Sequence, residues 1–263
     1  MASSNIRHVR RLPAIGLALA CAFCGPAHAA APGSVATGTE STLLAHDATG
    51  DLAAKHLRDN LLDEVFANFS LFIYVDKAQS GPLAQRMFIF DRTDDGGLAL
   101  LYDWPVSTGR DRYELDAAGH VQSTQTPSGF FELDPKRMFE DHVSGEWNEA
   151  MPYAMFFDWR PNGRQTGLAI HGTPDANLDE LGRAASAGCI RLSIDHAQTL
   201  FDLIQAQGLR PAPKLAYLDG GDGVSSEGLL LHDQAGNREM AENYSVLVRI
   251  DDYSGDDQIA SLL

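Results

Sequence analysis

A succession of short apolar runs, separated by turn-forming residues, most constrains the fold of this chain. Runs rich in β-branched and aromatic residues occupy positions 71–75, 86–90, 98–102, 154–157 and 167–170. Serine, glycine, proline and aspartate gather between them, as at residues 80–82 and 94–97. Short, closely spaced runs of this kind predict a mostly β fold, largely antiparallel, with a few helices.

Two segments have helical periodicity instead. Apolar residues recur at helical spacing from Asp51, which can cap a helix, to about Asn68. Ser193 is expected to cap a second helix, with an apolar stripe that ends at Gly208. The first helix is expected to pack against the strands that follow it.

The N-terminus has the three parts of a secretory signal peptide. Arg7, Arg10 and Arg11 are basic, residues 12–23 are apolar, and residues 27–29 read Ala-His-Ala, a cleavage site of small residues. A lipid anchor on Cys21 is the competing interpretation, but the preceding residues fit it poorly. We therefore expect a soluble protein in the periplasm. No other stretch reaches the roughly 18 apolar residues that a membrane span needs.

Charge limits the partners of this chain. The sequence has 20 basic and 36 acidic residues, a formal net charge of −16. Removal of a signal peptide that carries basic residues and no acidic ones would make the charge more negative still. A surface of this sign excludes general binding to polyanions, so nucleic acid is not expected as a partner.

Cys189 is the strongest candidate for a reactive side chain. The other two cysteines, Cys21 and Cys24, lie in the expected signal peptide, which leaves one unpaired thiol in an exported protein. A small buried core residue is the ordinary alternative. Gly188 before it, an arginine two residues later and a histidine upstream favour a nucleophile instead.

At this point the sequence resembles a known family. His171-Gly172, fourteen further residues and then Ser186-x-Gly188-Cys189-Ile190-Arg191 are similar to the signature of the L,D-transpeptidase (YkuD-type) catalytic domain. Motifs expected upstream occur in the same order at residues 106–109, 126–129 and 151–153. The resemblance covers roughly residues 70–218. It implies a mixed β-sandwich with the cysteine and histidine in a groove.

The domain organisation follows from these patterns. We expect a signal peptide at residues 1–29, a flexible leader with an amphipathic helix at 30–69, the catalytic domain at 70–218, and a linker with a C-terminal extension at 219–263. The extension is expected to be peripheral to the chemistry. Its apolar runs at 229–231 and 246–248 are expected to add a hairpin to a sheet edge.

The resemblance also implies roles for single residues. Cys189 becomes the nucleophile and His171 its base, and the Gly172 carbonyl orients the imidazole. The backbone amides of Gly188 and Cys189 are expected to hold an oxyanion. Further roles are an oxyanion neighbour for Tyr153 and substrate binding for Ser186 and Arg191, although an ordinary salt bridge is equally plausible for Arg191. Position 187 departs from the family, because Ala187 stands where a histidine is common.

The function implied is acyl transfer between peptidoglycan stem peptides, with formation of a 3-3 cross-link and without metal or other cofactor. The sequence has no His-x-x-x-His pair, and the exported form would keep a single cysteine, which disfavours a metal site. A hydrolase on the same fold and an inactive wall-binding module are the alternatives. Cys189 and His171 can act as a thiolate–imidazolium pair, or the histidine can take the proton during attack.

Overall fold

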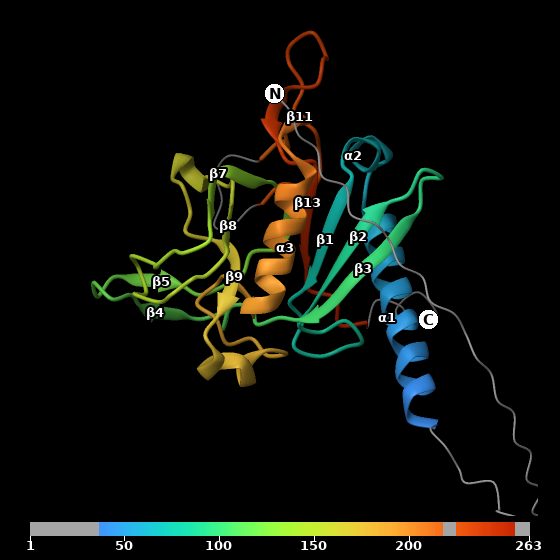
Figure 1. Ribbon diagram of the computed structural model, residues 1–263. Coiled ribbons are helices and arrows are strands. Elements are labelled where there is room, and N and C mark those ends of the chain that lie inside the picture. Colours follow the sequence, from blue (N-terminus) through green and yellow to red (C-terminus); the bar gives the residue numbers. More distant parts are fainter. Residues whose placement is uncertain (1–36, 218–224, 256–263) are drawn as a thin grey trace, which may run out of the picture. The chain divides into compact units, whose positions relative to one another are not determined.

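The computed structural model describes residues 37–217 and 225–255 (Figure 1). The chain divides into two compact units, Met1–Thr37 and Gly38–Leu263, and the first lies almost entirely outside the described residues. The signal peptide expected at residues 1–29 falls outside them as well. The fold and the candidate site belong to the second unit.

A five-stranded sheet in the order β3-β2-β1-β13-β6 forms the centre of the second unit. Strand β1 pairs in parallel with β13 and antiparallel with β2. All of β1 is buried, and because side chains alternate along a strand, its odd-numbered apolar residues face one core and its even-numbered ones another. The strands of this sheet are β1 (Leu71–Asp76), β2 (Arg86–Arg92), β3 (Leu98–Pro105), β6 (Gly129–Phe131) and β13 (Val246–Asp251).

A second sheet, of four strands in the order β10-β9-β8-β7, packs across the first of these cores. Helix α3 (Ile194–Gln207) contributes one apolar stripe to the same core. Figure 1 shows this helix between the two sheets. The strands of the second sheet are β7 (Leu133–Phe139), β8 (Ala154–Phe157), β9 (Ala169–Thr173) and β10 (Ile190–Ser193).

The other face of the five-stranded sheet is covered by α1 (Thr37–Asp59) and α2 (Asp63–Asn68). Leu57 and Val65, one from each helix, pack there on aromatic residues of β1 and β2. The prediction of a mostly β fold with few helices, arranged as a mixed sandwich, is confirmed.

Short elements complete the unit, and some of them shape the candidate site. None of the described helices combines the length and the apolar character that crossing a membrane requires. The short elements are β4 (Tyr113–Leu115), β5 (Val121–Ser123), η1 (Pro161–Gly163), η2 (Asp175–Glu180), β11 (Arg210–Pro213) and β12 (Met240–Asn243).

The two helical predictions have different outcomes. Helix α3 is as expected, since the Ser193 hydroxyl accepts a hydrogen bond from the His196 N–H at 3.2 Å and Gly208 ends the helix with a φ of 67°. Helix α1, however, begins at Thr37 rather than near Asp51. The expectation of a flexible leader is therefore wrong from residue 37 onward.

The expectation that the C-terminal extension adds a hairpin to a sheet edge is also wrong. Strand β13 lies inside the five-stranded sheet, parallel to β1 on one side and antiparallel to β6 on the other. The other apolar run does not pair with it, because Leu230 bridges to Leu215. A short apolar run has the same sequence whether its strand lies at an edge or in the centre, so the sequence alone did not distinguish them.

Ending the chain after Asp219 is expected to abolish folding. Four apolar side chains of β13 are almost fully buried, and burial on this scale contributes on the order of 6–12 kcal/mol, comparable with the net stability of a domain. Circular dichroism during heating should show no cooperative transition for this variant. A chain ended after Gly255 keeps β13 and should melt like the parent, and cooperative melting of both truncations would contradict the prediction.

Candidate active site

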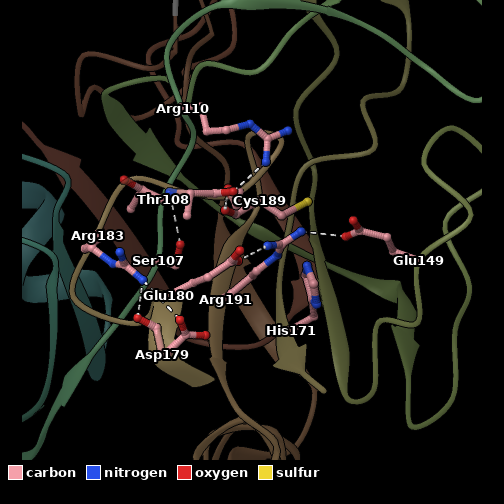
Figure 2. A network of polar contacts seen from close by, with 12 residues as sticks. Ser107, Thr108, Arg110, Glu149, His171, Asp179, Glu180, Arg183, Cys189 and Arg191 are labelled. Atoms are coloured by element: carbon pink, nitrogen blue, oxygen red, sulfur yellow. Dashed lines mark hydrogen bonds and ion pairs between the residues drawn. The ribbon is translucent and has the colours of Figure 1, made fainter. Parts of the chain in front are cut away.

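The register of two strands brings the predicted catalytic residues to one surface. Strands β9 and β10 run parallel with Ile170 opposite Ile190 and His171 opposite Arg191. The two isoleucines face the core between the sheets. Because side chains alternate, His171 and Arg191 project from the outer face, and so does Cys189, which directly precedes β10 (Figure 2).

Cys189, His171 and Arg191 line a cavity of about 550 Å³ on this outer face. Most of its walls come from loops that are distant in sequence, and no local pattern marked them. Ala187, at the position where the resemblance leads one to expect histidine, also lines the cavity. The wall residues that the sequence analysis missed include Gln125, Glu146, Trp147, Glu149 and Trp159.

The turn before Cys189 is fixed by hydrogen bonds within it. The Ser186 hydroxyl donates to the Cys189 carbonyl at 2.5 Å and accepts from the Gly188 N–H at 3.1 Å. Gly188 has a φ of +116°, and a Cβ there would lie 3.2 Å from the Gln125 carbonyl oxygen. Only glycine suits both the conformation and the close approach.

This turn corrects two expectations. Ser186 is completely buried, so it holds the turn rather than contacting substrate. The Gly188 N–H is already bonded to that serine, which removes it from the expected oxyanion site. The oxyanion donor that the pair can still offer is the Cys189 N–H.

A buried glutamine supports the same turn from behind. Gln85 accepts from the Thr108 N–H at 3.0 Å and donates to the Thr108 hydroxyl and the Lys77 carbonyl at 2.8 and 2.7 Å. The Thr108 carbonyl in turn accepts from the Ser186 N–H at 2.8 Å. Gln85 thus connects the end of β1 to the nucleophile turn through groups that have no contact with solvent.

The surroundings of the Cys189 thiol favour its neutral form. Its sulfur is half-buried at the cavity wall and donates to the Gly167 carbonyl at 3.5 Å. Burial raises the pKa of the thiol to about 11, against the opposing effects of the Ala169 amide and the Arg191 charge, and Glu146 and Glu149 raise it further. At neutral pH the thiolate fraction is on the order of one in ten thousand.

His171 is held as a neutral base. Its ring is almost fully buried, and Nδ1 lies 2.8 Å from the Gly172 carbonyl oxygen. A carbonyl can only accept, so Nδ1 carries the proton and Nε2 is left with its lone pair. Burial lowers the pKa of His171 to about 4, and the charges of Arg191 and His142 add to this, against the raising effect of the Gly172 bond.

The two side chains therefore do not form an ion pair at rest. The sulfur donates to Gly167 and not to the imidazole, and both groups are neutral at pH 7. Of the two possibilities left open by the sequence, this geometry favours proton transfer to His171 during attack over a resting thiolate–imidazolium pair.

Arg191 is occupied by the protein's own carboxylates. Its Nη1 donates to Glu180 at 2.8 Å and its Nη2 to Glu149 at 2.5 Å (Figure 2). The side chain is only 5% exposed. Because both terminal nitrogens of the guanidinium are paired, Arg191 links the segments that carry Glu149 and Glu180 to the sheet. This favours the role of a structural salt bridge over the expected contact with a substrate carboxylate.

Tyr153 lies away from the expected oxyanion site. Its ring packs on Phe201 of α3, with centroids 5.8 Å apart, and does not line the cavity. The residue has a φ of +54°, which turns the chain into β8. Its neighbour Pro152 accepts from the Gly172 N–H at 2.7 Å, so this segment supports the His171 strand from outside the cavity.

A metal site is not apparent in the part of the chain that the structure describes. Three or more histidine, cysteine, aspartate or glutamate side chains do not converge anywhere in it. The chemistry considered below uses only the chain's own residues.

Comparison with known families gives a match over most of this unit. The model described as the L,D-transpeptidase catalytic domain, YkuD, matches residues 71–224. No curated protein matches.

Solved structures give further matches at low identity. An L,D-transpeptidase fragment from Xylanimonas cellulosilytica is 16% identical, with 70% of this chain and 61% of that one covered and a TM-score of 0.39. An L,D-transpeptidase from Mycobacterium tuberculosis H37Rv is 16% identical, with coverage of 70% and 58% and a TM-score of 0.38. The helical cell shape determining protein Pgp2 from Campylobacter jejuni is 17% identical, with coverage of 70% and 48% and a TM-score of 0.38. In each case this chain spans less than two thirds of the solved protein.

Alkylation of Cys189 by a neutral electrophile should report the raised pKa. For a small electrophile that reacts without the help of His171, only the thiolate is reactive, so the rate is expected to rise about tenfold per pH unit from pH 7 until the pH nears 11. Mass spectrometry can follow the single adduct, with Cys189→Ser as the unreactive control. A rate that is already level below pH 7 would instead indicate a resting ion pair.

Replacement of Arg191 should lower stability even when charge is kept. In Arg191→Lys a single ammonium cannot reach Glu149 and Glu180 in the fork geometry, and in Arg191→Ala both carboxylates lose their partner. Loss of a charged hydrogen bond costs about 1.5–3 kcal/mol, so both variants should melt earlier, alanine more so. Parent-like melting temperatures combined with lost turnover would restore the substrate-binding role.

Proposed function

Since the chain belongs to the YkuD family of L,D-transpeptidase catalytic domains, we propose that it is a cysteine acyltransferase acting on peptidoglycan stem peptides. One observation carries this proposal beyond family membership. The single thiol of the described chain and a neutral imidazole with a free Nε2 line the same cavity. That pairing is what acylation of a cysteine requires.

Acylation begins with attack of the Cys189 sulfur on the carbonyl carbon between the third residue of a stem tetrapeptide and its terminal D-alanine. His171 Nε2 takes the thiol proton as the C–S bond forms, and the Gly172 carbonyl stabilises the resulting imidazolium through Nδ1–H. The Cys189 N–H faces the developing oxyanion. The imidazolium then gives its proton to the departing D-alanine nitrogen, and a thioester remains.

Transfer completes the reaction. An amine of a second stem attacks the thioester carbonyl, the C–N bond forms and the C–S bond breaks. His171 accepts the proton that the nitrogen sheds and returns it to sulfur. The product is a 3-3 cross-link, and the enzyme returns to the neutral thiol and imidazole of the structure.

Hydrolysis on the same site is the second candidate. Water can replace the amine, which would make the protein an L,D-carboxypeptidase or an amidase that releases wall-linked protein. Ala187 supports keeping this candidate, because a possible hydrogen-bond donor or proton relay is missing from the cavity wall. An inactive wall-binding module has less support, since the thiol remains accessible from the cavity.

The proposed reaction belongs in the periplasm. The basic and apolar segments of residues 1–29 support export, and peptidoglycan is the substrate there. The acidic net charge suits a protein that must diffuse along an anionic wall without adhering to it.

Incubation with muropeptides would test the proposal directly. A disaccharide tetrapeptide donor should give a covalent adduct on Cys189 with loss of D-alanine, detected by mass spectrometry of the intact protein. Cross-linked dimers in the products would identify a transferase, and tripeptides alone a hydrolase. Absence of any adduct with the tetrapeptide or with a carbapenem would refute both.

His171→Ala is expected to slow acylation of Cys189 by about 100-fold or more, the usual scale of general base catalysis. In the parent, the neutral base form of His171 persists above its pKa of about 4, so the acylation rate should fall as the pH drops through that value. Carbapenem acylation followed by mass spectrometry measures both effects. Gln125→Ala, another change in the cavity wall, serves as a control for general damage to the cavity.

A further inference from the structure

The side chains that line the cavity carry a net negative charge. Among its described lining residues Arg191 is the one arginine or lysine, and its charge is taken up by Glu149 and Glu180. His171 is neutral at physiological pH. Glu146 is left as a wall carboxylate that no described cation neutralises.

Glu146 lies close to the reacting sulfur. Its Oε2 is 3.3 Å from the point where a Cβ on Gly167 would lie, so the absence of a side chain at Gly167 makes room for the carboxylate. The carbonyl of the same glycine accepts the thiol proton of Cys189 at 3.5 Å. The backbone of Gly167 therefore lies between the Glu146 carboxylate and the Cys189 sulfur. The negative charge of Glu146 helps to raise the pKa of the thiol.

The backbone at Glu146 is anchored to the rest of the fold. Its backbone carbonyl accepts from the Ala117 N–H at 2.8 Å, which ties the loop to the turn between β4 and β5. The neighbouring Trp147 and the largely buried Trp159 also line the cavity. A cavity wall that contains both a carboxylate and tryptophans can bind a primary ammonium group, because the carboxylate pairs with its charge and aromatic rings make cation–π contacts.

We propose that Glu146 selects the acceptor of the transfer step, by binding the ammonium form of a primary amine beside the thioester on Cys189. This inference rests on the proposed acyl transfer and adds the residue that favours an amine over water. The bound ammonium releases one proton to solvent before its lone pair attacks the thioester carbonyl. The C–N bond then forms, the C–S bond breaks, and the second proton reaches sulfur through His171.

Glu146→Gln separates this role from acylation. The variant keeps the shape of the side chain and loses its charge, which helps to raise the pKa of the thiol, so a tetrapeptide donor should acylate Cys189 at least as fast as in the parent. The KM for meso-diaminopimelate as acceptor should rise roughly ten- to a hundredfold, the scale of a charge-assisted hydrogen bond. The ratio of transfer to hydrolysis should fall accordingly, with the hydrolysis rate unchanged.

Two controls make the test specific. Asp141→Asn removes an equally exposed carboxylate from the same loop outside the cavity and should leave the acceptor KM unchanged. Hydroxylamine, which is uncharged at neutral pH, should react with the acyl-enzyme of the parent and of Glu146→Gln at the same rate.

The outcomes also separate this inference from the proposed function. If no acyl-enzyme forms in the parent, the proposed acyl transfer fails and the role of Glu146 with it. If the acyl-enzyme forms and Glu146→Gln shows the acceptor KM of the parent, the inference on Glu146 is wrong and acyl transfer stands. The inference would also be wrong if Glu146→Gln lowered the reactivity of the acyl-enzyme towards diaminopimelate and towards hydroxylamine equally. Loss of a charge should not affect the reaction with a neutral nucleophile.

Discussion

The candidate site depends on the pairing of β9 with β10 more than on any other interaction. This pairing sets which side chains enter the core and which face the cavity, because the two strands share one pleat. A slip of one residue in β10 would turn Arg191 into the core and bring Ile190 to the cavity wall. The burial of Ile170, Ile190 and Leu192 beside α3 therefore fixes the catalytic geometry as well as the core.

Much of this arrangement could be predicted from the sequence because it depends on local patterns. Strands β1, β2 and β3, the caps of α3 and the Gly188-Cys189 turn are each specified mainly by neighbouring residues. The central place of β13 could not be predicted, since it depends on pairing with β1, 175 residues away in the sequence. Tyr153 was misplaced for a related reason, because its positive φ directs the ring towards α3.

Burial determines the protonation states at the site. It raises the pKa of Cys189 and lowers that of His171, so neutral forms are favoured in both, and the resting enzyme carries little nucleophilic thiolate. The polar chain from Gln85 through Thr108 to Ser186 holds the nucleophile turn without adding charge. Because oxidation proceeds through the thiolate, the same low thiolate fraction also limits oxidation of the free thiol.

The charges around the cavity also matter for position 187, where this chain has alanine and the family commonly has histidine. A second imidazole beside the nucleophile would supply a proton relay, and this chain lacks one at that position. The Arg191 charge is offset by Glu149 and Glu180, and Glu146 adds a further carboxylate to the cavity wall, so the net charge of the wall and the field that it produces are negative. Such a field repels carboxylates and attracts ammonium groups. Under the proposed acyl transfer, an acceptor that arrives as a cation would be concentrated next to the thioester, and a chain without the second histidine would still favour an amine over water.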